Sequence, residues 1–143
     1  MSETTAIVIA GGTGDLTQRK LLPALFNLLC KGRLPENITV IGFARRKLTD
    51  AEYRDMMWNG VREFGDFGGS RDDWDRFAKH LYYVAGDLGD PAAFDALSER
   101  LDACEAGFDR ANRLFYLSIA PEFHAPTIEN LRNRHLHTEE GGW

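Results

Sequence analysis

The sequence predicts an α/β fold built on a parallel sheet with helices on both faces. Short apolar runs alternate with stretches of helical periodicity in the order β-α-β-α-β-α-β-α, and the connections between them are short. Parallel strands joined in this way take right-handed crossovers, and we expect helices on both faces of the sheet. The chain stops soon after its last helical stretch, where a further strand would be natural, so we expect the sheet to be incomplete at the C-terminal end.

The individual elements follow from apolar patterns and their stop signals. Residues 6–10 (AIVIA) and 38–44 (ITVIGFA) are apolar and rich in β-branched residues, as expected of strands buried on both faces. From Leu16 onward, apolar residues repeat at helical spacing as far as the stop signal at Gly32. The other predicted elements are a helix that starts at the capping box 49–52 (TDAE) and runs toward Phe64, a short helix at 72–80, a strand at 81–87, a helix at 91–104 after the cap residue Asp90, a strand at 113–118 and a helix from 121 to about 136.

Length and composition set limits on the class of protein. The 143 residues suffice for one domain with a sizeable core, and 43% hydrophobic with 27% charged residues is typical of a globular protein. A net charge of -5 argues against nucleic acid as a partner. The apolar run 6–10 is too short for a membrane span or a signal peptide. Cys30 and Cys104 fall in apolar helical patterns, so we expect buried, reduced thiols and a cytoplasmic location.

A glycine-rich turn joins the first strand directly to the first helix. Gly12, Gly14 and Thr17 trace the pattern G-x-G-x-x-G with a small residue in place of the last glycine, and Gly11 with Gly14 gives G-x-x-G. Such a turn brings backbone N–H groups and a helix N-terminus close to a phosphate, which Cβ atoms would obstruct. The turn therefore predicts a Rossmann-like nucleotide site, and a structural turn without a ligand is the alternative. The spacing of a P-loop is absent.

The ends of the other strands indicate which nucleotide binds. An NAD site usually has Asp or Glu at the end of its second strand, whereas this strand is followed by Arg45, Arg46 and Lys47. A guanidinium can bind a 2′-phosphate that a carboxylate would repel, so NADP is favoured over NAD, with a solvated basic turn as the alternative. Asp87 lies at the end of the predicted third strand and can approach the adenosine or act as a turn residue. Residues 118–121 would line the crevice near the nicotinamide.

Four segments together resemble the coenzyme domain of glucose-6-phosphate dehydrogenases. They are GGTGDLTQRKLLPALFNL, IGFARR, AGDLGDPAAF and LFYLSIAPEFH, in the family's order and at compatible spacings. The resemblance covers essentially the whole chain. It implies that residues 1–143 form an N-terminal NADP-binding domain fragment, and that the catalytic and substrate domain is absent from this chain.

The resemblance also implies roles for individual residues. The coenzyme diphosphate would be wrapped by Gly11, Gly12, Thr13, Gly14, Asp15, Leu16, Thr17 and Gln18. Arg45, aided by Arg46, would hold the 2′-phosphate; Gly86 and Asp87 would lie near the adenosine. Lys20 would lie close to the phosphate of the substrate, glucose 6-phosphate, which the family oxidises to the lactone with hydride transfer to NADP. The complete enzyme would be a homo-oligomer.

The family's E-K-P segment and its R-I-D-H-Y-x-G-K segment, which carries the catalytic histidine, are missing, so no catalytic residue is expected here. His124 is the only candidate base near the expected crevice, and a surface histidine is the favoured interpretation. His80, His135 and His137 do not complete a metal cluster with it, so no metal site is predicted.

Two other functions remain open. A short-chain-type NADP reductase would also carry GGTG after a strand, but it requires Tyr-x-x-x-Lys, and no tyrosine has a lysine four residues later. A non-catalytic NADP-binding module would share every feature of the coenzyme site.

Overall fold

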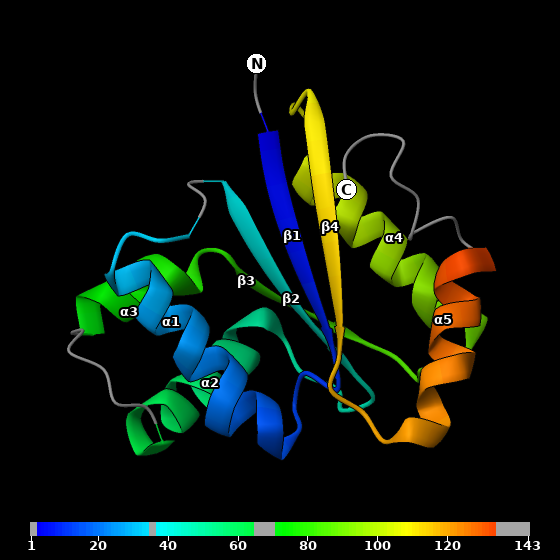
Figure 1. The fold of residues 1–143 in the computed structure, drawn as a ribbon, viewed down its shortest axis with the longest axis horizontal. Coiled ribbons are helices and arrows are strands. Elements are labelled where there is room, and N and C mark those ends of the chain that lie inside the picture. Colours follow the sequence, from blue (N-terminus) through cyan, green and yellow to red (C-terminus); the bar gives the residue numbers. More distant parts are fainter. Residues whose placement is uncertain (1–2, 35–36, 65–70, 134–143) are drawn as a thin grey trace.

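The computed structural model describes residues 3–34, 37–64 and 71–133. Within them, four parallel strands form one sheet in the order β3-β2-β1-β4 (Figure 1). The strands are β1 (Glu3–Ala10), β2 (Ile38–Ala44), β3 (Leu81–Ala85) and β4 (Arg110–Leu117). The register pairs Ile7 of β1 with Val40 of β2 and with Leu114 of β4.

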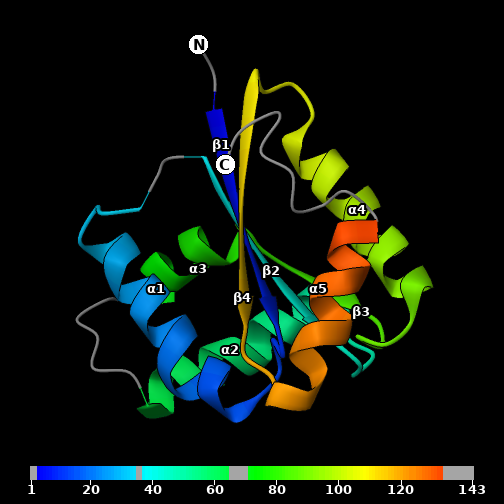
Figure 2. The ribbon, with the colours of Figure 1, turned by 45° about the vertical axis from the view of Figure 1, so that its right-hand side comes forward.

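Helices cover both faces of this sheet, which confirms the predicted α/β class. One face carries α1 (Leu22–Cys30), α2 (Asp50–Phe64) and α3 (Arg71–Ala78), and the other carries α4 (Pro91–Glu105) and α5 (His124–Asn133) (Figure 2). A π-helical turn, η1 (Thr17–Leu21), leads into α1, and a 3₁₀ turn, η2 (Pro121–Phe123), leads into α5. None of the helices in the described part of the chain is long and apolar enough to cross a membrane.

Strand β2 lies between β1 and β3 and is buried along its whole length, because helices cover it on both sides. On the α1–α3 face the core is aromatic: the rings of Phe26 and Trp74 meet edge to face at 5.4 Å. On the α4–α5 face Phe43 of β2 meets Phe94 of α4 at 5.2 Å. Both cores therefore hold β2, and with it the residues that follow β2, in a fixed position.

Helix caps form as the sequence predicts. In the capping box before α2, the Glu52 backbone N–H donates to the Thr49 hydroxyl, and the Thr49 N–H donates to the Glu52 carboxylate. The Asp90 carboxylate accepts from the N–H of Ala92 at the start of α4. Gly32 ends the helical run with a positive φ of 67°.

The two edges of the sheet differ. At β3, the Asp50 carboxylate accepts from the Tyr83 backbone N–H at 2.8 Å, and the Arg54 guanidinium donates to the Leu81 carbonyl at 2.8 Å. Side chains of α2 thus occupy outward-facing backbone groups of this edge. At β4, within the described residues, no strand lies on the outer side, and Leu114 (46% exposed) and Tyr116 (43% exposed) reach solvent.

The structure corrects three expectations about the elements. Cys30 is exposed rather than buried, because it is the last residue of α1 and lies past the core; Cys104 is half-buried, and both thiols are free. Strand β1 begins at Glu3 and β4 at Arg110, each three residues earlier than predicted, since polar residues there pair in the sheet. The predicted final helix is split into η2 and α5, and residues 134–136 of it lie outside the described residues.

Candidate functional site: a crevice at the carboxyl ends of the strands

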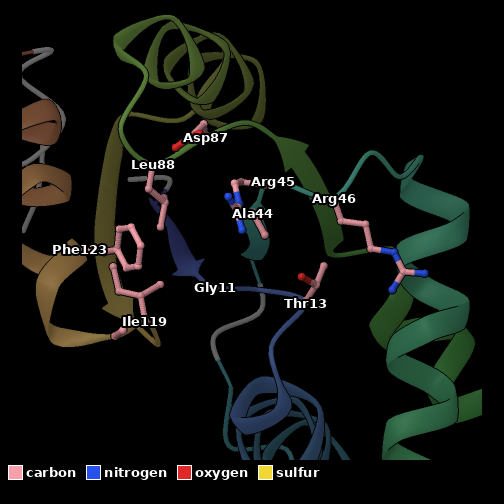
Figure 3. Close-up of a pocket in the computed structure, with 10 residues that line it drawn as sticks. Gly11, Thr13, Ala44, Arg45, Arg46, Asp87, Leu88, Ile119 and Phe123 are labelled. Carbon is pink, nitrogen blue, oxygen red and sulfur yellow. The ribbon is translucent and has the colours of Figure 1, made fainter.

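A cavity of about 360 Å³ opens where β1, β2, β3 and β4 end (Figure 3). Parallel α/β sheets bind ligands at this edge, where the strand order reverses, here between β1 and β4. The cavity is lined by Gly11, Thr13, Ala44, Arg45, Arg46, Asp87, Leu88, Ile119, Ala120 and Phe123. The lining is basic on the β2 side and apolar on the side of Leu88 and Phe123.

Gly11 begins the loop after β1 and tolerates no side chain. Its φ is +82°, and a Cβ atom there would lie 2.1 Å from the Ser118 carbonyl oxygen. Its own N–H donates to the Phe43 carbonyl at 2.9 Å. The loop is therefore pressed between the ends of β2 and β4, at the point where the sheet opens into the cavity.

Gly12 makes the second close approach. A Cβ atom on Gly12 would lie 2.7 Å from the Cα atom of Gly42, in the middle of β2. Glycine at both positions, Gly12 in the loop and Gly42 in the strand, lets the backbone of the loop lie in direct contact with the backbone of β2. The absent Cβ atoms make room for the protein's own backbone, so the loop Gly11–Gly14, here called the glycine cradle, lies directly against the ends of β2 and β4. This position places the start of the helix at the sheet edge where Rossmann-like domains bind a diphosphate.

The helix that follows presents its N-terminus toward the loop. Helical backbone begins at Asp15, and the N–H groups of a first helical turn have no acceptor within the helix. The buried Thr17 hydroxyl donates to the Gly11 carbonyl at 3.0 Å, and the Gln18 amide donates to the Thr13 carbonyl at 2.9 Å. These side chains bind loop carbonyls, while the N–H groups of Gly11 and Gly12 donate to the Phe43 carbonyl and that of Gly14 donates to the Gly11 carbonyl. An anion would therefore bind at the N–H groups of the first helical turn rather than at those of the loop glycines.

The helix passes through η1 just before Pro23, which lies at the start of α1. Proline lacks an N–H and its ring clashes with the carbonyl four residues earlier in a regular helix. The wider π turn accommodates that clash, so the chain runs from the loop to α1 without a break.

The basic side of the cavity comes from the residues after β2. Arg45 and Arg46 are both exposed, and among the residues that the structure describes neither forms an ion pair. In Figure 3 the guanidinium of Arg46 points away from the side formed by Leu88 and Phe123. The Asp87 carboxylate, across the cavity, accepts from the Gly89 N–H at 2.9 Å, as in a turn. The arrangement can bind a phosphorylated anion beside an apolar wall.

Two tyrosines beneath the cavity were not predicted from the sequence. The buried Tyr53 hydroxyl, from α2, donates to the Gly12 carbonyl at 2.8 Å. The Tyr83 hydroxyl, from β3, donates to the Ala44 carbonyl at 3.1 Å and is within hydrogen-bonding distance of the Arg46 carbonyl. Burial raises the pKa of Tyr53 above its ordinary range; it raises the pKa of Tyr83 to about 12, although the Arg46 charge opposes that shift. A signal existed: the glycine inside β2 indicates that another group approaches closely.

The structure brings five of the predicted residues to one cavity: Gly11, Thr13, Arg45, Arg46 and Asp87. The others lie around it. Gly86 packs against α4, since a Cβ atom there would lie 2.4 Å from that of Ala93. The remaining predicted residues, which belong to the loop and the helix after it, are Gly12, Gly14, Asp15, Leu16, Thr17, Gln18 and Lys20. Of these, Asp15 is paired with Arg19, and Lys20 is exposed.

The two histidines among the described residues, His80 and His124, give no second site. The His124 Nε2 atom lies 3.1 Å from the Ile119 carbonyl oxygen, at the start of α5 and next to the cavity wall. No cluster of His, Cys, Asp or Glu able to hold a metal occurs within residues 3–34, 37–64 and 71–133. His135 and His137 lie outside the described residues.

The strand order, the glycine loop and the position of the cavity define a Rossmann-like dinucleotide-binding domain. The family model described as "Glucose-6-phosphate dehydrogenase, NAD binding domain" matches residues 8–143. The chain therefore belongs to the glucose-6-phosphate dehydrogenase family, and within it to the NAD-binding domain.

Individual relatives agree with this membership. The chain is 34% identical over 138 residues to glucose-6-phosphate 1-dehydrogenase of Leuconostoc mesenteroides, covering 96% of this chain and 28% of that protein. It is 38% identical over 130 residues to the Chlamydia pneumoniae enzyme, covering 90% and 25%. A solved structure of glucose-6-phosphate dehydrogenase in complex with glucose 6-phosphate matches with a TM-score of 0.84 and 31% identity, covering 99% and 29%. The chain thus spans between 25% and 29% of the length of these relatives.

Proposed function

We propose that the chain binds NADP and is the coenzyme-binding part of an enzyme that oxidises D-glucose 6-phosphate to 6-phosphoglucono-1,5-lactone, in the pentose phosphate pathway. The observation that carries the proposal is the position of Arg45 and Arg46 beside the glycine cradle, with no ion-pair partner among the described residues. A guanidinium binds a phosphate through two parallel hydrogen bonds, and the carboxylate that an NAD site uses is replaced here. NADP, when bound, supplies the acceptor for the hydride that leaves C1 of the sugar.

Different residues of the chain bind different parts of the coenzyme. The N–H groups of the first helical turn bind the diphosphate, while the Thr17 and Gln18 side chains fix the loop through the carbonyls of Gly11 and Thr13. Arg45, with Arg46, binds the 2′-phosphate, and Asp87 lies on the adenosine side. The loop residues of this site are Gly11, Gly12, Thr13, Gly14, Asp15, Leu16, Thr17 and Gln18, with Gly86 supporting the Asp87 turn.

Substrate contacts extend beyond this domain. Lys20 is exposed on the helix that leaves the loop, and in this proposal its ammonium group contacts the sugar phosphate. Oxidation of the C1 hydroxyl requires a base within hydrogen-bonding reach, and no residue of this chain is assigned to that role. We therefore expect the chain alone to bind coenzyme without oxidising glucose 6-phosphate. For the complete enzyme we propose a cytoplasmic homo-oligomer without nucleic-acid or membrane partners.

The test is thermal unfolding of the chain alone, with NADP and with NAD. A nucleotide at 100 times its dissociation constant stabilises the fold by about 2.7 kcal/mol, or roughly 5–10 °C at this size. We expect NADP to raise the midpoint more than NAD does at equal concentration. Arg45→Ala should reduce the NADP shift to that of NAD, whereas Lys47→Ala, a matched loss of charge two residues later, should leave it unchanged. A melt that neither nucleotide moves would refute the proposal.

A further inference from the structure

We propose that Tyr53 and Tyr83 are positioning residues, one for the glycine loop and the other for the arginine turn, and that they set coenzyme affinity and selectivity separately. The inference rests on the proposed NADP site and adds to it two residues that do not line the cavity. Both act through backbone carbonyls of residues that do the binding.

Tyr53 holds the loop. It is fully buried in α2, and its hydroxyl reaches across 41 positions of sequence to the Gly12 carbonyl. Gly12 lies between Gly11 and Gly14 in the loop, so the direction of its peptide governs where the next N–H group points. Without the phenol, a buried carbonyl would lack its partner, and the loop would gain freedom to turn.

Tyr83 holds the turn after β2. Its hydroxyl donates to the Ala44 carbonyl and approaches that of Arg46, so it contacts backbone carbonyls on both sides of Arg45. The Tyr83 backbone is fixed in turn, because its N–H donates to Asp50, which is paired with Arg100 of α4. The backbone of Arg45 and Arg46, which follows β2, is therefore positioned by Tyr83 of β3.

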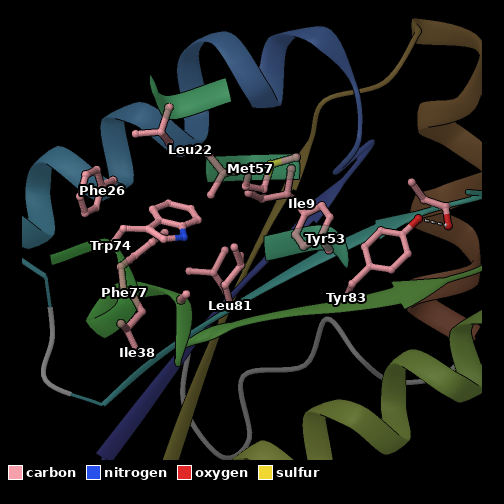
Figure 4. Close-up of a cluster of buried hydrophobic side chains, with 14 residues drawn as sticks. Ile9, Leu22, Phe26, Ile38, Tyr53, Met57, Trp74, Phe77, Leu81 and Tyr83 are labelled. Carbon is pink, nitrogen blue, oxygen red and sulfur yellow. Dashed lines mark hydrogen bonds between the residues drawn. The ribbon is translucent and has the colours of Figure 1, made fainter. Parts of the chain in front are cut away.

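The two rings lie against each other, with centroids 4.8 Å apart and planes at 30° (Figure 4). Burial keeps both phenols protonated far above neutral pH, so each remains a hydrogen-bond donor. Gly42 provides the space for this arrangement: a Cβ atom there would lie 2.3 Å from the Tyr53 hydroxyl oxygen. Three residues from three elements thus form one support under the cavity.

The two contacts predict different binding signatures. The diphosphate is common to NAD and NADP, so Tyr53→Phe should weaken both by about the same factor, roughly fivefold for one lost hydrogen bond. The 2′-phosphate occurs only in NADP, so Tyr83→Phe should weaken NADP about fivefold and NAD by less than about twofold. A purely structural role would lower stability without changing the ratio of the two affinities.

The experiment is isothermal titration of NADP and NAD into the folded 143-residue chain and its variants, with thermal unfolding of each. Tyr82→Phe is the matched control, because it removes a hydroxyl from the adjacent residue, whose ring packs with the opposite core. Gly42→Ala is a second route to the loop: it displaces the Tyr53 hydroxyl and should reproduce the Tyr53→Phe signature.

Failure of the proposed function and failure of the positioning role give different results. If the unmodified chain binds neither nucleotide, the proposed function fails and this inference fails with it. If it binds NADP but Tyr83→Phe keeps the NADP-to-NAD affinity ratio, the positioning role is overturned while the proposed function stands. Should Tyr53→Phe not fold, that ratio in Tyr83→Phe decides alone.

Discussion

Replacing Gly11 by alanine tests whether the cradle is as tight as the geometry indicates. The residue has a φ of +82°, which an alanine adopts at a cost of about 1 kcal/mol. Its new Cβ atom would lie 2.1 Å from the Ser118 carbonyl oxygen, closer than any real contact. The overlap can be relieved only if the chain after β1 moves away from the chain after β4.

That movement has a cost that follows from the hydrogen bonds it breaks. The Ser118 N–H donates to the Ala10 carbonyl at 2.9 Å, and the Thr17 hydroxyl donates to the Gly11 carbonyl at 3.0 Å. Each bond contributes about 1 kcal/mol net. With the backbone term, Gly11→Ala should lower the free energy of unfolding by about 3 kcal/mol, or roughly 10 °C in the midpoint.

The assay is urea and thermal unfolding followed by circular dichroism, with Gly32→Ala as the matched control. Gly32 also has a positive φ, of 67°, but a Cβ atom there would meet nothing within 4 Å. It should therefore lose only the backbone term, about 1 kcal/mol. Equal losses in the two variants would refute the reasoning, because they would mean that the Ser118 contact contributes nothing.

Three further predictions concern other parts of the molecule. Thr17→Val should lower the free energy of unfolding by about 1 kcal/mol because the bond from the buried Thr17 hydroxyl to the Gly11 carbonyl is lost, while that carbonyl keeps the Gly14 N–H as a donor. Thr17→Ser keeps the hydroxyl and should lose less stability in the same urea titration. The contribution of the two phenols to the free energy of unfolding should be constant below about pH 10 and should fall as the pH rises toward 12, because unfolded phenols ionise near 10 while burial raises the pKa of Tyr83 to about 12 and that of Tyr53 further. In thermal melts at about pH 10 to 12, the loss of stability with pH should be smaller for Tyr83→Phe than for the unmodified chain. The exposed edge at Leu114 and Tyr116 should make the chain self-associate in light scattering, and Leu114→Lys should reduce this; a monomer at all concentrations would contradict it.

The sequence predicts the interior of the sheet better than its ends. Strand β2 spans residues 38–44 as expected, because helices bury it on both faces and its apolar run is continuous. Strand β1 begins earlier than its apolar run, since Thr4 is buried with its hydroxyl donating to the Asn37 carbonyl at 2.9 Å. A buried polar residue satisfied by a distant carbonyl leaves no trace in hydrophobic periodicity.

In the site, too, some features could be predicted from the sequence and others could not. The glycine loop and the arginines were predicted because each lies in one short stretch whose chemistry is local. The contact between Tyr53 and Gly12 was not, because the residues are 41 positions apart and belong to elements whose packing no pattern specifies. Gly86 was expected near the adenosine, whereas its nearest constraint is Ala93 of α4, a packing relation that a G-D pair after a strand does not reveal.

The unequal edges of the sheet limit how copies of this chain can join. An open filament would need the β4 edge of one copy to pair with the β3 edge of the next, but Asp50 and Arg54 already occupy the Tyr83 N–H and the Leu81 carbonyl there. Pairing of β4 with β4 uses the same edge twice and leaves the two β3 edges, each with the Tyr83 N–H and the Leu81 carbonyl occupied, on the outside. Edge-to-edge association should therefore favour a closed pair over an open filament, and the Asp50 contact that positions Tyr83 also disfavours pairing at β3.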